Sequence, residues 1–355
     1  MSFDDKVAHL RLLMQERNLQ GIVLRRSPNV AWLIGGRAHV AMVVDAGCLD
    51  VVITPTTVRA ITNRIEANRL QAEELPAAVD VEFVDWQQGR DGLLPTGAEI
   101  GSDTPGADRV DLGKEIESLR QVLDAADRER FEQICRDAAS ALGAAMKAAR
   151  TDDREVDIAG RIASALWSAD LEPVVLLVAG ERRAPLMRHP LPTTDVVGAR
   201  AIGSICARRK GLIASVTRVV AFAEFTEAQW QQYDGLLAVE GAMLDATKPG
   251  SPFSAVLEAA RAAYPNAGFA ADEWTKHHQG GPTGFLPRDW PATLTSASTM
   301  RTGQPVAWNP TAAGLKVEDT WVVESDGPRL LSLDPLWPTR EAAGRARPTV
   351  WRSGS

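Results

Sequence analysis

The pattern of the chain changes near Leu112, and this change limits the possible folds more than any other feature. The segment 112–150 is long, rich in alanine and amphipathic, which predicts two consecutive helices. Helices and strands alternate before it, whereas strands follow one another after it. A chain of 355 residues is also too long for one comfortable core. We therefore predict two domains, residues 1–118 and residues 119–355.

The first part predicts a small α/β domain. Helical periodicity runs to about Gln20, behind a capping box at Ser2 and Asp5. The remaining pattern predicts strands at 21–25, on both sides of 45–47, at 81–86 and at 98–103, a loop or short helix at 29–36, and a helix at 57–69.

The second part predicts an α+β domain. Its expected strands lie at 172–180, 199–208, 210–216, 217–225, 305–310, 314–324 and 328–333, and its expected later helices at 227–246 and 253–264. Strands that follow each other directly form antiparallel pairs. This order therefore favours an antiparallel sheet with helices on one side over a doubly wound sheet.

Charge and composition exclude several classes of protein. The net charge of −7 argues against a nucleic-acid partner, which requires a basic face. No apolar run approaches the length of a membrane span, and the first residues lack the pattern of a secretory signal. Three widely spaced cysteines form neither a disulfide framework nor a zinc motif. We expect a cytoplasmic protein with a small-molecule substrate.

The segment HHQGGPTGF (277–285) carries two of only five histidines in the chain. Adjacent histidines before paired glycines suit a metal site, an acid/base site or a glycine turn. If the segment enters a strand, His277 and His278 point to opposite faces and only one reaches a cavity. Trp274, Trp290, Trp308 and Trp321 lie near the polar motifs and predict an aromatic wall of a pocket.

Five segments together resemble the creatinase and aminopeptidase P family. They are NVAWLIGG (29–36), RHPLPT (188–193), KGLIASVTRVV (210–220), HHQGGPTGF and VAWNPTAAGLKVEDTWVV (306–323). The resemblance covers nearly the whole chain. It implies a pita-bread α+β domain behind a smaller α/β domain, and a homodimer.

The resemblance also implies that the metal centre of this family is missing. Metal-dependent members hold two ions with two Asp, one His and two Glu, and these positions fall on Ser204, Ser215, Gly281, Asn309 and Glu318. One carboxylate cannot neutralise two dications. We therefore expect no metal and no cofactor. Gly281 would in addition leave space for a substrate.

Catalytic roles follow from the same resemblance. His189 matches the acid/base histidine of creatinase, a metal-free member, and imidazole titrates near neutrality. Glu318 would orient His189 or hold a cationic substrate nitrogen. His277 matches a histidine that contacts substrate in metal-dependent members.

The other candidate residues would bind substrate. Arg288 could grip a carboxylate with two parallel hydrogen bonds. Asn309, Ser215 and Ser204 would line the cavity as neutral donors and acceptors. The remaining candidates are His278, Trp308 and Arg218, the last of which could instead pair with Glu318.

These residues favour a metal-independent hydrolase of a C–N bond, of amide or amidine type, in a small polar molecule. A lyase, cyclase, isomerase or non-catalytic binding protein is an alternative. A metallopeptidase with a single ion at His189, His277 and Glu318 is a third.

Overall fold

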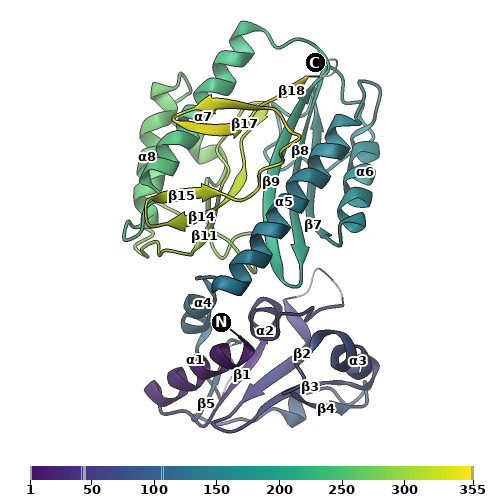
Figure 1. Cartoon of the computed structure of the whole chain (residues 1–355), viewed down its shortest axis with the longest axis vertical. Coiled ribbons are helices and arrows are strands. Elements are labelled where there is room, and N and C mark those ends of the chain that lie inside the picture. Colours follow the sequence, from purple (N-terminus) through teal and green to yellow (C-terminus); the bar gives the residue numbers. More distant parts are fainter. Residues whose placement is uncertain (1, 41, 43–44, 105, 107, 353–355) are drawn as a thin grey trace. The chain divides into compact units, whose positions relative to one another are not determined.

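The computed structural model describes residues 2–40, 42, 45–104, 106 and 108–352, and it divides the chain into two compact units (Figure 1). The first unit runs to Asp127 and includes residues 210–212, and the second contains the rest. The predicted boundary after residue 118 falls inside helix α4 (Gly113–Arg120). Within the described part of the chain, no helix is both long and apolar enough to cross a membrane.

The first unit contains a six-stranded mixed sheet in the order β4-β3-β2-β1-β5-β6. Strands β1, β2 and β3 pair antiparallel, and the outer pairs are parallel. The elements are α1 (Phe3–Glu16), β1 (Gly21–Arg26), α2 (Ser27–Ile34), β2 (Ala46–Ile53), β3 (Val58–Asn63), α3 (Arg64–Arg69), η1 (Leu70–Glu74), β4 (Asp80–Val84), η2 (Asp91–Leu93), β5 (Ile100–Ser102), β6 (Val110–Asp111) and α4.

The helix predicted at 57–69 is wrong in its first half. Val58–Asn63 forms β3, which is paired on both sides, with β2 and with β4. Hydrogen bonds to two neighbouring strands outweigh the helical pattern. Asn63 then caps α3 by accepting hydrogen bonds from the backbone of Ile65 and Glu66. The first strand predicted around 45–47 includes residues 41, 43 and 44, which lie outside the described residues.

The second unit begins with two helices and a four-stranded sheet. Figure 1 shows α5 (Ala125–Lys147) and α6 (Glu155–Ser168) along one side of this sheet. The strand order is β18-β9-β8-β7, with β7 at Glu172–Gly180, β8 at Arg200–Arg209, β9 at Leu212–Ala221 and β18 at Trp351–Arg352. The two strands predicted between 210 and 225 are therefore one continuous strand, β9.

A second sheet of the same unit has the order β10-β11-β14-β15. Helices α7 (Glu227–Ala246) and α8 (Phe253–Asn266) share a large apolar core with it. The strands are β10 (Gly280–Pro282), β11 (Pro305–Trp308), β14 (Asp319–Glu324) and β15 (Gly327–Leu330). Short elements complete the unit: η3 (Glu273–Lys276), β12 (Thr311–Ala312), β13 (Leu315–Lys316), β16 (Thr339–Ala342) and β17 (Arg345–Pro348). The predicted α+β class is confirmed.

Candidate active site

A cavity of about 290 Å³ lies in the second unit, where strands β7 and β8 face the segments that carry the sequence motifs. Its lining consists of Val175, Leu177, His189, Ser204, Ile205, Cys206, His278, Pro287, Arg288, Asn309, Lys316 and Glu318. Six of the predicted site residues are in this lining: His189, Ser204, His278, Arg288, Asn309 and Glu318. The structure thus collects most of the predicted site around one space.

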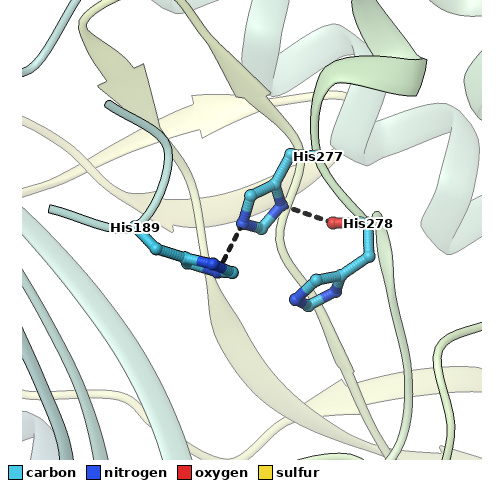
Figure 2. A group of neighbouring side chains, drawn as sticks. All are labelled: His189, His277 and His278. Carbon is cyan, nitrogen blue, oxygen red and sulfur yellow. Dashed lines mark hydrogen bonds between the residues drawn. The ribbon is translucent and has the colours of Figure 1, made fainter. Parts of the chain in front are cut away.

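Three imidazoles meet at the edge of this cavity (Figure 2). Nε2 of His277 lies 2.8 Å from Nε2 of His189. The rings of His277 and His278 stack with their centroids 4.4 Å apart, whereas His189 meets His277 edge-on at 4.6 Å. His277 is buried behind His189, so it contacts the acid/base candidate without lining the cavity itself.

Only His278 of the adjacent histidines lines the cavity, as expected, but the expected opposite directions of the two side chains are wrong, because their rings stack. The rings can lie side by side because His277 directly follows the 3₁₀-helix η3, and the strand β10 begins only at Gly280. The alternation of faces that a strand imposes therefore does not apply to this pair.

The shortest hydrogen bonds of the cluster indicate where its protons lie. A carbonyl oxygen only accepts, so Nδ1 of His277 donates to the backbone carbonyl of His278 at 2.5 Å. Burial, and next the charge of Lys316, lower the pKa of His277 to about 3, so this ring is neutral and its Nε2 accepts. Nε2 of His189 must then be the donor. Burial and Lys316 also lower the pKa of His189, which leaves Nδ1 of a neutral His189 as its basic atom.

Glu318 is held by positively charged groups and not by His189. Its Oε1 accepts from Nη2 of Arg288 at 2.9 Å, and its Oε2 accepts from Nζ of Lys316 at 2.8 Å and from Thr217 at 2.7 Å. Burial would raise the pKa of this carboxyl, but Lys316 and Arg288 outweigh burial and lower it to about 2. The contact that orients His189 comes from His277, so the expected orienting role of Glu318 is not what the geometry shows.

Lys316 is a site residue that the sequence reasoning missed. Its side chain is almost fully buried, lines the cavity and lowers the pKa of all three histidines. A signal was present in the sequence, because Lys316 precedes Glu318 by two positions in an extended segment. Residues at that spacing share a face.

Arg288 lines the cavity, but its end groups are already engaged. Nη1 donates to Ser215 at 3.0 Å and to the carbonyl of Pro287, and Nη2 donates to Glu318. The expected two-bonded grip on a substrate carboxylate is therefore contradicted. Ser215 lies behind this guanidinium and does not line the cavity.

Trp308 does not contact the cavity. It is fully buried, its indole N–H donates to Thr247, and its ring lies 6.2 Å from that of Phe253. Asn309, the next residue, lines the cavity, so Trp308 points to the opposite face, into the helical core. No tryptophan is among the described residues that line the cavity, and the predicted aromatic wall is wrong.

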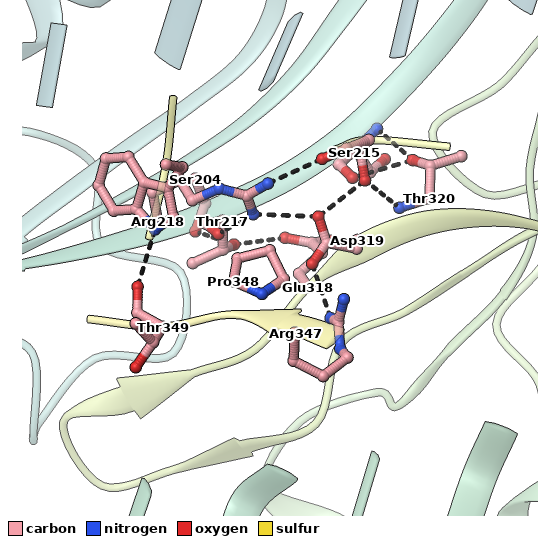
Figure 3. A network of polar contacts seen from close by, with 12 residues as sticks. Ser204, Ser215, Thr217, Arg218, Glu318, Asp319, Thr320, Arg347, Pro348 and Thr349 are labelled. Atoms are coloured by element: carbon pink, nitrogen blue, oxygen red, sulfur yellow. Dashed lines mark hydrogen bonds and ion pairs between the residues drawn. The ribbon is translucent and has the colours of Figure 1, made fainter. Parts of the chain in front are cut away.

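Arg218 is also wrongly predicted to bind substrate. It is buried with Asp319, to which it donates at 3.0 Å, and Asp319 in turn pairs with Arg347 (Figure 3). Arg347 binds Glu240 through two nitrogens, so two arginines and two carboxylates form a balanced network. The preceding residue, Thr217, points toward Glu318 instead.

The profile of metallopeptidase family M24 matches residues 129–325, which is more than half of the chain. This chain belongs to metallopeptidase family M24. A search of curated proteins finds no match. The resemblance stated from the motifs is thereby confirmed at the level of the family.

Solved M24-like structures confirm the pita-bread fold of the chain. Prolidase from Pyrococcus horikoshii OT3 has a TM-score of 0.79 at 17% identity, covering 93% of this chain and 98% of that chain. Dipeptidase PepE from Mycobacterium ulcerans has a TM-score of 0.77 at 17% identity, covering 99% and 98%. The N-terminal domain of the FACT complex subunit SPT16 from chickpea (Cicer arietinum) has a TM-score of 0.69 at 12% identity, covering 93% and 94%.

The positions that the motifs assign to M24 metal ligands have other contacts here. Ser204 is hydrogen bonded to Thr217 at 2.7 Å, and Ser215 accepts from Arg288. Gly281 has no side chain, and Glu318 is paired with two cations. Neutral hydroxyls and a neutralised carboxylate are a poor fit to two divalent ions.

The backbone around Gly281 leaves no room for a side chain. A Cβ atom there would lie 2.3 Å from the carbonyl oxygen of Trp290 and 3.2 Å from the backbone nitrogen of Ala292. The expectation that Gly281 opens space for a substrate is therefore wrong, because the neighbouring segment fills that space.

Replacing Gly281 with alanine is expected to lower the free energy of unfolding by about 1–3 kcal/mol, because backbone must move to accept the methyl group. Urea denaturation measures this change. Gly160 in α6 is a matched control, since a Cβ there meets nothing within 4 Å and alanine should stabilise the helix by about 0.5–1 kcal/mol. Equal stability of Gly281→Ala and the wild type would contradict the close approach of Trp290.

Proposed function

We propose that this M24 protein hydrolyses a C–N bond of a small polar molecule without a metal centre, with His189 as general base and acid. The observation that carries the proposal is the salt bridge of Glu318 with Arg288 and Lys316. Two side-chain cations provide the charge that metal ions provide in a metallopeptidase. Both cations are covalently part of the chain, so the site does not have to bind them from solution.

Electrostatics support the absence of a metal pair. Two dications would add four positive charges next to Arg288 and Lys316, with Glu318 as the only anionic ligand among the positions that match the family motif. A carboxylate that is already neutralised gives little further stabilisation to a metal. Ser215 would have to release the guanidinium of Arg288 before it could bind an ion.

The positions of the protons in the histidine cluster support a metal-free hydrolysis. Nδ1 of His189 takes a proton from water as the water oxygen attacks the carbon of the scissile bond. The same nitrogen then returns the proton to the leaving nitrogen, the C–N bond breaks, and an acid and an amine are formed. His277 holds His189 in the required tautomer through the bond between the two Nε2 atoms.

The lining of the cavity favours a substrate with an anionic group. Of its residues, Arg288 and Lys316 are positive and Glu318 alone is negative. Asp289 follows Arg288, but its carboxylate oxygens are shielded from solvent and it is not in the lining. Val175 and Leu177 add an apolar part to the lining. We therefore propose a small amide or amidine that carries a carboxylate.

Removal of metal ions tests this function. Protein dialysed against a strong chelator is expected to release amine from at least one member of a panel of N-acyl amino acids, ureido acids and amidino acids, at the same rate as untreated protein. Adding Mn²⁺ should not increase the rate. Activity that disappears on chelation and returns with Mn²⁺ would overturn the proposal.

A non-hydrolytic enzyme or a binding protein is the second candidate. The similarity to the N-terminal domain of a FACT complex subunit favours it, since that protein is a subunit of a complex. The same panel of compounds distinguishes a hydrolase from a binding protein. Compounds that raise the melting temperature but are never hydrolysed would support binding alone.

A further inference from the structure

We propose that His189, His277 and His278 form a binding site for one divalent transition-metal cation of the zinc type, and that this ion inhibits the site. This ion is distinct from the metal pair of metallopeptidases, because none of the three histidines stands at a position that the motifs assign to that pair. The binding part of the proposal stands on geometry alone. The inhibitory part rests on the function proposed above.

The nitrogens of the three imidazoles are already nearly as close to one another as the ligands of one metal ion. One nitrogen from each ring can be chosen so that all three lie within 4.8 Å of each other, and the two Nε2 atoms are 2.8 Å apart. A zinc ion with Zn–N bonds of about 2.0–2.1 Å holds tetrahedral ligands roughly 3.3 Å apart. Side-chain rotations that move the ring nitrogens by about 1 Å would therefore bring them to ligand distance.

The surroundings of the cluster also resemble those of a metal-bound histidine. A ligating imidazole usually donates its other N–H to a carbonyl or carboxylate, and Nδ1 of His277 donates to the carbonyl of His278 (Figure 2). Nδ1 of His278 is buried and makes no hydrogen bond in the described structure. A buried nitrogen without a partner is costly, and a bound cation would satisfy this ring.

Charged neighbours determine which cation fits. Lys316 and Arg288 line the cavity with Glu318 and leave it one positive charge in excess. Hard cations such as Mg²⁺ and Ca²⁺ need anionic oxygen ligands and gain little from three neutral nitrogens. Zn²⁺, Co²⁺ and Cu²⁺ bind imidazole strongly enough to tolerate the nearby ammonium group. Removing the charge of Lys316 should strengthen the binding of such an ion.

Binding would also change the protonation of His189. The cation takes the place of the hydrogen shared between Nε2 of His189 and Nε2 of His277. His189 must then carry its proton on Nδ1, which is the nitrogen that accepts a proton in the hydrolysis proposed above. The bound ion thus removes the base, and zinc should act in the opposite direction from the metal of a metallopeptidase.

Titration of the metal-free protein with Zn²⁺ by calorimetry, and with Co²⁺ by visible absorption, tests the site without any substrate. One ion per chain is expected to bind, with the absorption of a nitrogen-ligated Co²⁺. His278→Asn should weaken binding by at least about tenfold, the smallest loss usually seen even for an outer-shell partner. Lys316→Met should strengthen it, and His9→Asn, on the surface of α1, should not change it.

The outcomes separate the site from the proposed function. Absence of saturable one-to-one binding, or equal binding by His278→Asn, overturns the site whether or not the protein is a hydrolase. Lys316→Met keeps all three ligands and is expected to bind the ion more tightly. Such a gain in affinity cannot be produced by misfolding. If the ion binds and hydrolysis is unchanged at saturating Zn²⁺, the site stands and the inhibitory role is overturned.

Discussion

Replacing His189 with alanine is expected to lower kcat by about 10²–10⁴-fold, the usual contribution of a general acid/base. The change removes the nitrogen that takes the proton from water and returns it to the leaving amine. KM should change little, because Arg288 and Lys316 remain in the cavity. Steady-state release of amine from the panel substrate measures both constants.

His9→Ala is the matched control for this variant. His9 lies on the surface of α1, where its ring contacts the backbone of Asp5, far in sequence from the cluster. It should retain wild-type kcat. Full turnover by His189→Ala would exclude His189 as the base and with it the proposed mechanism.

Replacing Glu318 with glutamine is expected to lower the free energy of unfolding by about 3–5 kcal/mol, because it leaves two buried cations without their counter-charge. Arg288 and Lys316 both bind this carboxylate, and all three side chains are less than a tenth exposed. Glutamine has the same shape, so packing changes little. Urea denaturation of both proteins at neutral pH gives the difference.

The difference should depend on pH in a defined direction. The pKa of Glu318 falls from its ordinary value of 4.5 to about 2 in the folded protein. Its ionic contribution is therefore complete above pH 4.5 and is lost as the pH falls through about 2, below which the carboxyl is protonated in both states. The difference in the free energy of unfolding between the wild type and Glu318→Gln should therefore decrease as the pH falls from 4.5 to 2.

Glu324→Gln is the control for a surface pair. Glu324 accepts from Arg329 at 2.7 Å, but both side chains are substantially exposed, so the change should stay within about 0.5 kcal/mol. A loss at Glu318 no larger than this would show that its carboxylate does not hold Arg288 and Lys316 in a buried pair.

Local sequence was sufficient for much of the fold. Helix α7 occupies 227–246 as predicted, because a capping box at Thr226 marks its start and its apolar positions repeat at helical spacing. The motifs also led to six of the residues that line the cavity and to the family. These features depend on neighbours in the chain, which a sequence displays directly.

The error at 57–69 has a different cause. Val58–Asn63 is a strand because β2 and β4 lie on either side of it, and partners distant in sequence are not visible in a local pattern. The errors at Trp308 and Arg218 have another cause. Each neighbours a residue of the site, but the direction of its side chain is set by the alternation of an extended backbone.

The sequence by itself determined the family and the α+β class, and its motifs predict the positions at which metal ligands are replaced. The tertiary structure alone decided what surrounds the remaining carboxylate: it placed Arg288 and Lys316 on Glu318 and brought His189 to His277 across 88 positions. Motif matching compares each residue with its own position in the family. A compensating charge can come from any segment that folding brings near, so only the folded chain shows that these cations and this carboxylate form one unit.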